Sequence, residues 1–218
     1  MTPATHAAVA AVIASRFRNL AVALVLSFGI HFVLDAVYHF EAVYPVSVPG
    51  RWSYGRTMMI LFAGFIAAGT PVLVWIWRKN PQVWLFGCYA FLMCSVVFER
   101  LPLWRLLWAT LLTVIWCLVT PAPAARRCVV CAFVAYLPDS LKKLYPAFER
   151  FHDAAHYSSA LDLGDWVSML ARGRWKLKPD TLAFDPYYLI GYTVEVVLEM
   201  TILFGCLWWL VKAEDRRS

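Results

Sequence analysis

The chain has 218 residues, of which 61% are hydrophobic and 16% charged, and 20 basic against 14 acidic side chains give a formal net charge of +6. Soluble domains are about half apolar and a quarter charged, so this composition and the mean hydropathy of +0.62 favour a membrane protein. No basic stripe with interleaved aromatic residues is present, so the positive balance favours anionic lipid headgroups over nucleic acid as a partner.

The chain begins with MTPATHAAVAAVIASRFRN, in which the arginines follow the apolar patch. A secretory signal carries its basic residues before the apolar region. We therefore expect residues 1–19 to form a short amphipathic or disordered lead, and not a cleaved signal.

Five apolar runs approach the roughly 20 residues that a membrane-spanning helix needs. They cover residues 20–40, 57–77, 82–98, 106–120 and 186–211. A sixth run, residues 128–137, is short and predicts a thickened span, a re-entrant helix or a helix buried within the protein. The runs predict an all-α fold, a polytopic membrane helix bundle with five or six membrane segments. We expect one membrane domain over residues 1–218, with spans within 20–138 and 186–211 and a tail at 212–218.

Residues 139–185 differ from the runs on either side because they mix charges, tryptophans and glycine or proline breaks. This pattern predicts short interfacial helices that lie over the mouth of the bundle.

One stripe of polar side chains follows the first apolar run. His31, Asp35 and His39 are spaced four apart, so on a helix all three lie on one face. Ionisable groups within a membrane cost several kcal/mol and usually face a cavity or a partner. The stripe therefore favours a functional site, although such residues also serve as polar contacts between helices.

A second pair of histidines, His152 and His156, has the same spacing, by which two imidazoles on one helix face bind one metal ion. Asp139 follows a proline at the end of the sixth run. In a six-segment bundle residues 128–137 are the fifth segment in chain order, so their far end faces the same side as the far end of the first run and the clusters can meet. Imidazole and carboxylate suit zinc, manganese or iron. The predicted ligands, for one or two divalent ions with zinc preferred, are His31, Asp35, His39, Asp139, His152 and His156.

Further acidic and basic residues are candidates for supporting roles. Glu195 and Glu199 form another pair spaced four apart, whose alternative role is a structural hydrogen bond between helices. The candidates for proton transfer are Asp35, Asp153, Glu195 and Glu199. The candidates for holding a phosphate group of the substrate are Lys142, Lys143, Arg172 and Arg174.

Cys128 and Cys131 form a CxxC motif beside two arginines, which would lower a thiol pKa. Membrane thiol oxidoreductases also need a second cysteine pair in a loop, and the remaining cysteines lie in apolar runs. Packing is therefore favoured, and a thiol oxidoreductase stays open as an alternative.

The segment HFVLDAVYH (31–39) resembles the H-x-x-L-D-A-(I/L)-P-H signature of small bacterial integral membrane proteins labelled metal-dependent hydrolases. In that family a proline–aspartate, an H-x-x-x-H and a last membrane helix follow, and here PD (138–139), His152 with His156 and the final run occur in that order. Tyr38 replaces the usual proline, and Glu195 stands in a helix that more often carries glutamine. A weaker likeness, through SFGIH (27–31) and HDAAH (152–156), is to ceramidase-type membrane hydrolases.

The leading hypothesis is a membrane-embedded, metal-dependent hydrolase that acts on a lipid-borne ester, amide or phosphoester. The resemblance implies a multi-pass protein of the bacterial inner membrane, with membrane lipid and a membrane protein complex as partners and no nucleic acid. One alternative is a non-enzymatic membrane subunit or small transporter that uses the His/Asp/Glu set for protons or for a structural metal or haem.

Overall fold

The computed structural model describes residues 3–36, 67, 69–98, 102–142, 144–157 and 186–215, and every regular element among them is a helix. The all-α part of the predicted fold class is therefore confirmed for the described residues. In chain order the elements are α1 (Pro3–Arg16), α2 (Leu20–Ala36), α4 (Pro81–Met93), the 3-10 helix η1 (Cys94–Phe98), α5 (Pro102–Val119), α6 (Pro123–Leu141), α7 (Pro146–Tyr157) and α9 (Pro186–Asp215). Residues 69–79 are also helical.

The helix starts follow from local sequence. Proline suits the first helical position because its fixed φ matches the helix and its missing N–H has no partner there anyway. Helices α1, α4, α5, α6, α7 and α9 all begin at a proline. At α4 the side-chain oxygen of Asn80 accepts hydrogen bonds from the N–H groups of Gln82 and Val83, at 3.0 and 3.1 Å. Asn19 caps α2 in the same way, through the N–H of Ala21 at 2.9 Å.

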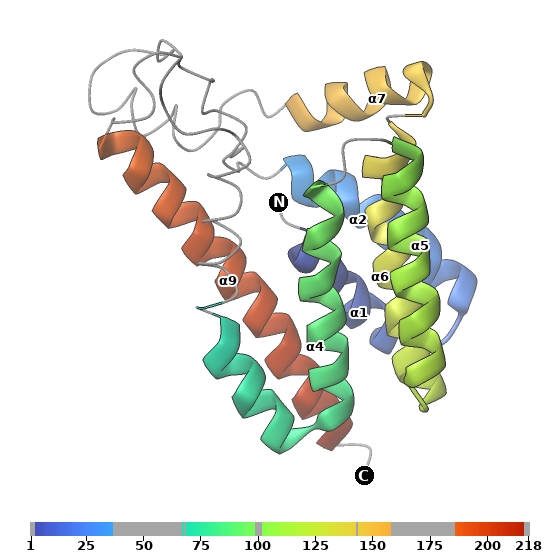
Figure 1. Cartoon of the computed structure of the whole chain (residues 1–218), viewed down its shortest axis with the longest axis vertical. Coiled ribbons are helices and arrows are strands. Elements are labelled where there is room, and N and C mark those ends of the chain that lie inside the picture. The colour runs from blue at the N-terminus through green and yellow to red at the C-terminus, as the bar shows by residue number, and fades with distance from the viewer. Residues whose placement is uncertain are drawn as a thin grey trace.

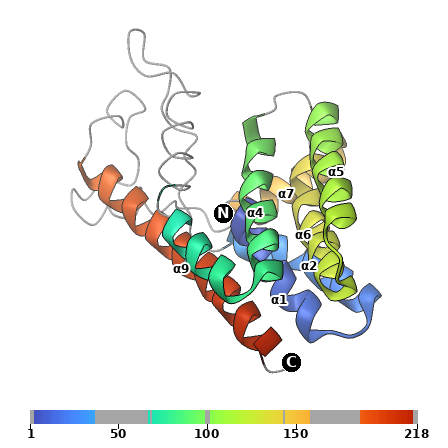
Figure 2. The ribbon, with the colours of Figure 1, turned by 60° about the horizontal axis from the view of Figure 1, so that its bottom comes forward.

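Helix α1 is the central element of the bundle. It packs against α2, α4, α6 and α9, and Figures 1 and 2 show it between α9 and the pair α2 and α6. Helices α4, α5 and α6 run side by side in Figure 1, and α7 lies across the ends of α2 and α6. The site described below lies under α7.

Residues 3–16 of the expected amphipathic or disordered lead form the helix α1, which is largely buried. Its alanines allow close packing on several sides, because a methyl group lets a neighbouring helix approach closely. Ala4, Ala7, Ala8 and Ala11 are at most 1% exposed. The end of α1 is fixed as well, since Arg127 of α6 donates to the carbonyls of Arg18, at 2.7 Å, and Phe17.

The prediction of a polytopic bundle in a bacterial inner membrane is wrong. None of the helices in the described part of the chain combines the length and the apolar character that crossing a bilayer requires. For example, α2 has 17 residues, a length of about 26 Å at 1.5 Å per residue, against about 30 Å for the hydrocarbon core of a bilayer. The sixth apolar run is part of the 19-residue α6, which includes Arg126 and Arg127. Most of the second run and most of the predicted interfacial region lie outside the described residues.

The packing of α1 leads to a stability prediction. Replacing Ala11 by Leu adds three carbon atoms to a fully buried position, which should destabilise the protein by about 1–3 kcal/mol through overpacking. The matched control is Ala124→Leu in the exposed first turn of α6, which should change stability by less than about 0.5 kcal/mol. Urea unfolding measures both variants, and equal effects would contradict the central position of α1.

Candidate metal centre

The centre begins on α2, where His31 and Asp35 lie one turn apart on the face that meets α6 and α7. The ring nitrogen Nδ1 of His31 is 3.0 Å from the backbone carbonyl oxygen of Ala135 on α6. A carbonyl only accepts, so Nδ1 carries the proton and Nε2 presents its lone pair. That Nε2 lies 3.0 Å from Oδ2 of Asp35. Metal-binding histidines are commonly oriented through their other nitrogen in this way.

Helix α7 places His152 opposite His31, because aromatic side chains of α7 pack against an aromatic side chain of α2. Phe32 contacts Phe148 and Phe151 with ring centroids 6.3 and 5.4 Å apart, at steep interplanar angles. Such edge-to-face pairs add to the apolar contact itself. His152 follows Phe151 directly, and its Nε2 comes within 3.0 Å of Nε2 of His31. Because His31 carries its proton on Nδ1, the two facing nitrogens need a proton or a cation between them.

Helix α6 contributes Asp139 from its last turn. Its Oδ1 lies 3.6 Å from Nε2 of His152 and 2.9 Å from Nζ of Lys142. The preceding Pro138 has no N–H, so it cannot make the usual helical hydrogen bond to the carbonyl four residues earlier. The side chains of Asp139 and Lys142 are 26% and 17% exposed, whereas His31, Asp35 and His152 are buried. The centre therefore opens toward Asp139 and Lys142.

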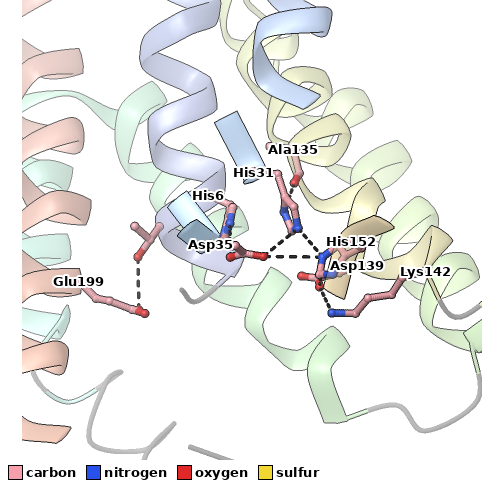
Figure 3. A network of polar contacts seen from close by, with 9 residues as sticks. His6, His31, Asp35, Ala135, Asp139, Lys142, His152 and Glu199 are labelled. Atoms are coloured by element: carbon pink, nitrogen blue, oxygen red, sulfur yellow. Dashed lines mark hydrogen bonds and ion pairs between the residues drawn. The ribbon is translucent and has the colours of Figure 1, made fainter. Parts of the chain in front are cut away.

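The four side chains together have the composition and spacing of a metal site. One ligand atom from each of His31, Asp35, Asp139 and His152 lies within 4.8 Å of all the others. The individual contacts are 3.0, 3.0, 3.6 and 3.7 Å. Ligand atoms around tetrahedral zinc lie about 3.3 Å apart, given metal–ligand distances of about 2.0–2.1 Å. These residues, seen in Figure 3, could hold a metal ion, and we call them the metal centre.

The electrostatics keep the ligands in their binding forms. Burial, together with the nearby Lys142 ammonium, lowers the pKa of His152 to about 4, so this imidazole is neutral at pH 7. Burial acts to raise the pKa of Asp139, but the Lys142 ammonium outweighs it and holds the pKa well below its usual range. Metal binding requires a neutral imidazole and an ionised carboxylate, and both are present at neutral pH.

His6 on α1 is a further member of this neighbourhood that the sequence reading did not include. Its Nε2 lies 3.1 Å from Oδ1 of Asp35, and its ring centroid is 4.6 Å from that of His31. His6 has no ionisable neighbour three or four residues away, so no local pattern marked it. The only signal was a lone histidine within an alanine-rich stretch.

The other predicted site residues fall into two groups. Glu199 of α9 is buried, accepts a hydrogen bond from Thr5 at 3.4 Å and is not part of the metal centre. It lies apart from the histidines in Figure 3. The remaining candidates have side chains outside the described residues, so their roles stay predictions: His39, Lys143, Asp153, His156, Arg172, Arg174 and Glu195.

The CxxC motif is built into the helix packing. The thiol of Cys128 lies 3.6 Å from the carbonyl oxygen of Ala11, and Cys131 is fully buried. Burial raises the pKa of Cys131, which disfavours the thiolate that thiol–disulfide exchange requires. The two cysteines of the motif thus contribute to the packing around α6, and Cys128 packs against α1.

Comparison of the chain with protein-family models, with curated proteins and with solved structures gives no match. The geometry of the metal centre is therefore the observation that bears on function.

The metal centre predicts that the chelator-stripped protein takes up about one Zn²⁺ per chain, with a rise in the unfolding temperature. An ion that binds only the folded state stabilises it by about 2.7 kcal/mol at one hundred times its Kd. The double variant His31→Ala, His152→Ala removes two of the four ligands and should lose both effects. Elemental analysis and thermal unfolding measure them.

The control for that experiment is the double variant Cys128→Ala, Cys131→Ala, which changes two neighbouring side chains of α6 that could also bind zinc. It should take up zinc like the wild type. Full uptake by the histidine variant, or loss of uptake in the cysteine variant, would contradict the assignment of ligands.

Proposed function

We propose that the chain is a metal-dependent hydrolase that cleaves an ester, amide or phosphoester bond at the metal centre. One observation carries the proposal: two imidazole nitrogens and two carboxylates from three helices converge within 4.8 Å at a place that opens on one side. Zinc is the preferred ion because it binds imidazole and carboxylate readily, and manganese and iron are the alternatives. Such an ion acts as a Lewis acid and lowers the pKa of a bound water toward neutrality.

The buried ligands would hold the ion, and their burial would exclude water from this side of the site. His31 and His152 contribute Nε2, and Asp35 contributes Oδ2. All three are at most 4% exposed, and the ring of Phe32 packs against both His31 and His152. Only the side of Asp139 remains for the approach of water and substrate.

Lys142 has a separate role at this open side. Its ammonium group is partly exposed and pairs with Asp139 at 2.9 Å. A donor in this position can stabilise the negative charge that develops on the oxygen of the scissile group. The same positive charge would also hold a phosphate in place, which agrees with a phosphoester as substrate.

The direct test is a panel of chromogenic substrates, namely p-nitrophenyl esters, p-nitrophenyl phosphodiesters and p-nitroanilides. The zinc-, manganese- or iron-loaded protein should hydrolyse at least one class. Chelator treatment or the double variant His31→Ala, His152→Ala should reduce the rate to background. Failure on every class with the loaded protein, or hydrolysis that survives loss of the ion, would contradict the proposal.

Replacing Lys142 by Met should separate catalysis from ion binding. The loss of a donor to the developing oxyanion should lower kcat by about 10²–10³-fold. Zinc affinity should stay the same or rise, because the ammonium no longer repels the cation or competes for Asp139. Lys212→Met, at an exposed lysine in the last turn of α9, is the control and should leave both unchanged. A parallel loss of zinc binding and kcat in Lys142→Met would contradict this role.

A further inference from the structure

The two oxygens of Asp35 face different helices. Oδ2 lies 3.0 Å from Nε2 of His31, on the same helix, and 3.7 Å from Nε2 of His152 on α7. Oδ1 lies 3.1 Å from Nε2 of His6 on α1, an ion-pair contact that lacks the alignment of a hydrogen bond. Figure 3 shows His6 on the side of the carboxylate away from His152. One oxygen is thus directed to the metal centre and the other to His6.

We propose that His6 is a positioning residue for the metal centre, holding Oδ1 of Asp35 through the ion-pair contact with its Nε2 so that this carboxylate would bind an ion through Oδ2 alone. The inference rests on the proposed function, because it concerns the same ion. A carboxylate can ligate through one oxygen or through both. Committing Oδ1 to His6 keeps Asp35 monodentate, so the four protein ligands would fill four positions and a water could take a fifth, whereas a bidentate Asp35 would fill it.

His6 is held firmly enough for this role. It is 2% exposed, and its ring lies against that of His31 at an interplanar angle of 33°. The alanines on either side, Ala4, Ala7 and Ala8, are buried in the contacts of α1. The ring therefore cannot turn away from Asp35 without disturbing His31 or the core. Through His6, a helix that contributes no ligand sets the geometry of the ion.

The neighbouring Thr5 provides a matched control. It is also fully buried on α1 and also makes a hydrogen bond to a carboxylate, but to Glu199 at 3.4 Å and not to Asp35. A change at Thr5 disturbs the same helix to a similar degree and leaves Asp35 alone. It separates the positioning role of His6 from general damage to α1.

The test compares His6→Phe, His6→Gln and Thr5→Val in the full chain, with zinc affinity measured by competition against a chromophoric chelator. His6→Phe keeps a flat ring and loses the Nε2 contact, so zinc should bind about 10–100-fold more weakly, the usual effect of removing a partner of a ligand. His6→Gln restores an N–H and should recover part of the loss, while Thr5→Val keeps wild-type affinity. Wild-type affinity in His6→Phe, or an equal loss in Thr5→Val, would overturn the proposal.

Cobalt substitution gives a readout that a merely structural role would not change. Without His6, Oδ1 of Asp35 is released to join Oδ2 on the ion and raise its coordination number. The visible absorption of Co²⁺ weakens as its coordination number rises above four. His6→Phe should therefore absorb more weakly than wild type at saturating Co²⁺, and an unchanged spectrum would overturn the monodentate assignment.

A final measurement needs no ion and so distinguishes this inference from the proposed function. In the metal-free protein at pH 8, long-range ¹H–¹⁵N spectra should place the His6 proton on Nε2, with the signal assigned by its absence in His6→Gln. A proton on Nδ1 alone would overturn the inference, whether or not the protein binds metal. Failure of the wild type to bind any ion would overturn the proposed function instead.

Discussion

The buried carboxylate of Asp35 is the group on which the rest of the metal centre depends. A carboxylate that is removed from water without partners loses several kcal/mol of solvation, and its removal is tolerated only when donors or a cation surround it. Here Nε2 atoms of three imidazoles, from α1, α2 and α7, lie within 3.7 Å of its oxygens. The histidines that surround the Asp35 carboxylate therefore join α1, α2 and α7 at one buried charge.

The fold supplies this arrangement through ordinary packing. The alanines of α1 bring its backbone close enough for His6 to reach Asp35, and the phenylalanines between α2 and α7 set His152 over His31. The carbonyl of Ala135 fixes which nitrogen of His31 carries the proton. Backbone and apolar groups therefore decide the chemistry of the polar ones, as in many metal sites.

The sequence allowed part of this to be predicted. The four-residue spacing of His31 and Asp35 is a local property of a helix, so their common face could be read directly. The expectation that they meet the segments around Asp139 and His152 relied on an assumed six-segment membrane topology. That topology is wrong, yet the residues do come together, because α6 and α7 both pack on α2.

The expectation of membrane spans failed, and that for residues 1–19 stayed open, for physical reasons. Hydropathy counts apolar side chains along the chain, whereas a span needs them within one helix of sufficient length, a condition that no helix in the described ranges meets. For residues 1–19 the sequence left an amphipathic and a disordered lead open, whereas the buried alanines of α1 have small side chains that suit a helix surrounded by others. The contribution of His6 depends on that long-range packing, and the hydrogen bond of His31 to a backbone carbonyl has no signature in a side-chain pattern.

X-ray absorption at the zinc K-edge tests the central claim most directly, because it reports the atoms bound to the ion. The zinc-loaded wild type should show imidazole nitrogen and carboxylate oxygen at about 2.0–2.2 Å, with the imidazole signal consistent with two histidines. A sulfur shell at about 2.3 Å, a zinc spectrum without imidazole, or a protein that retains no zinc would contradict the account.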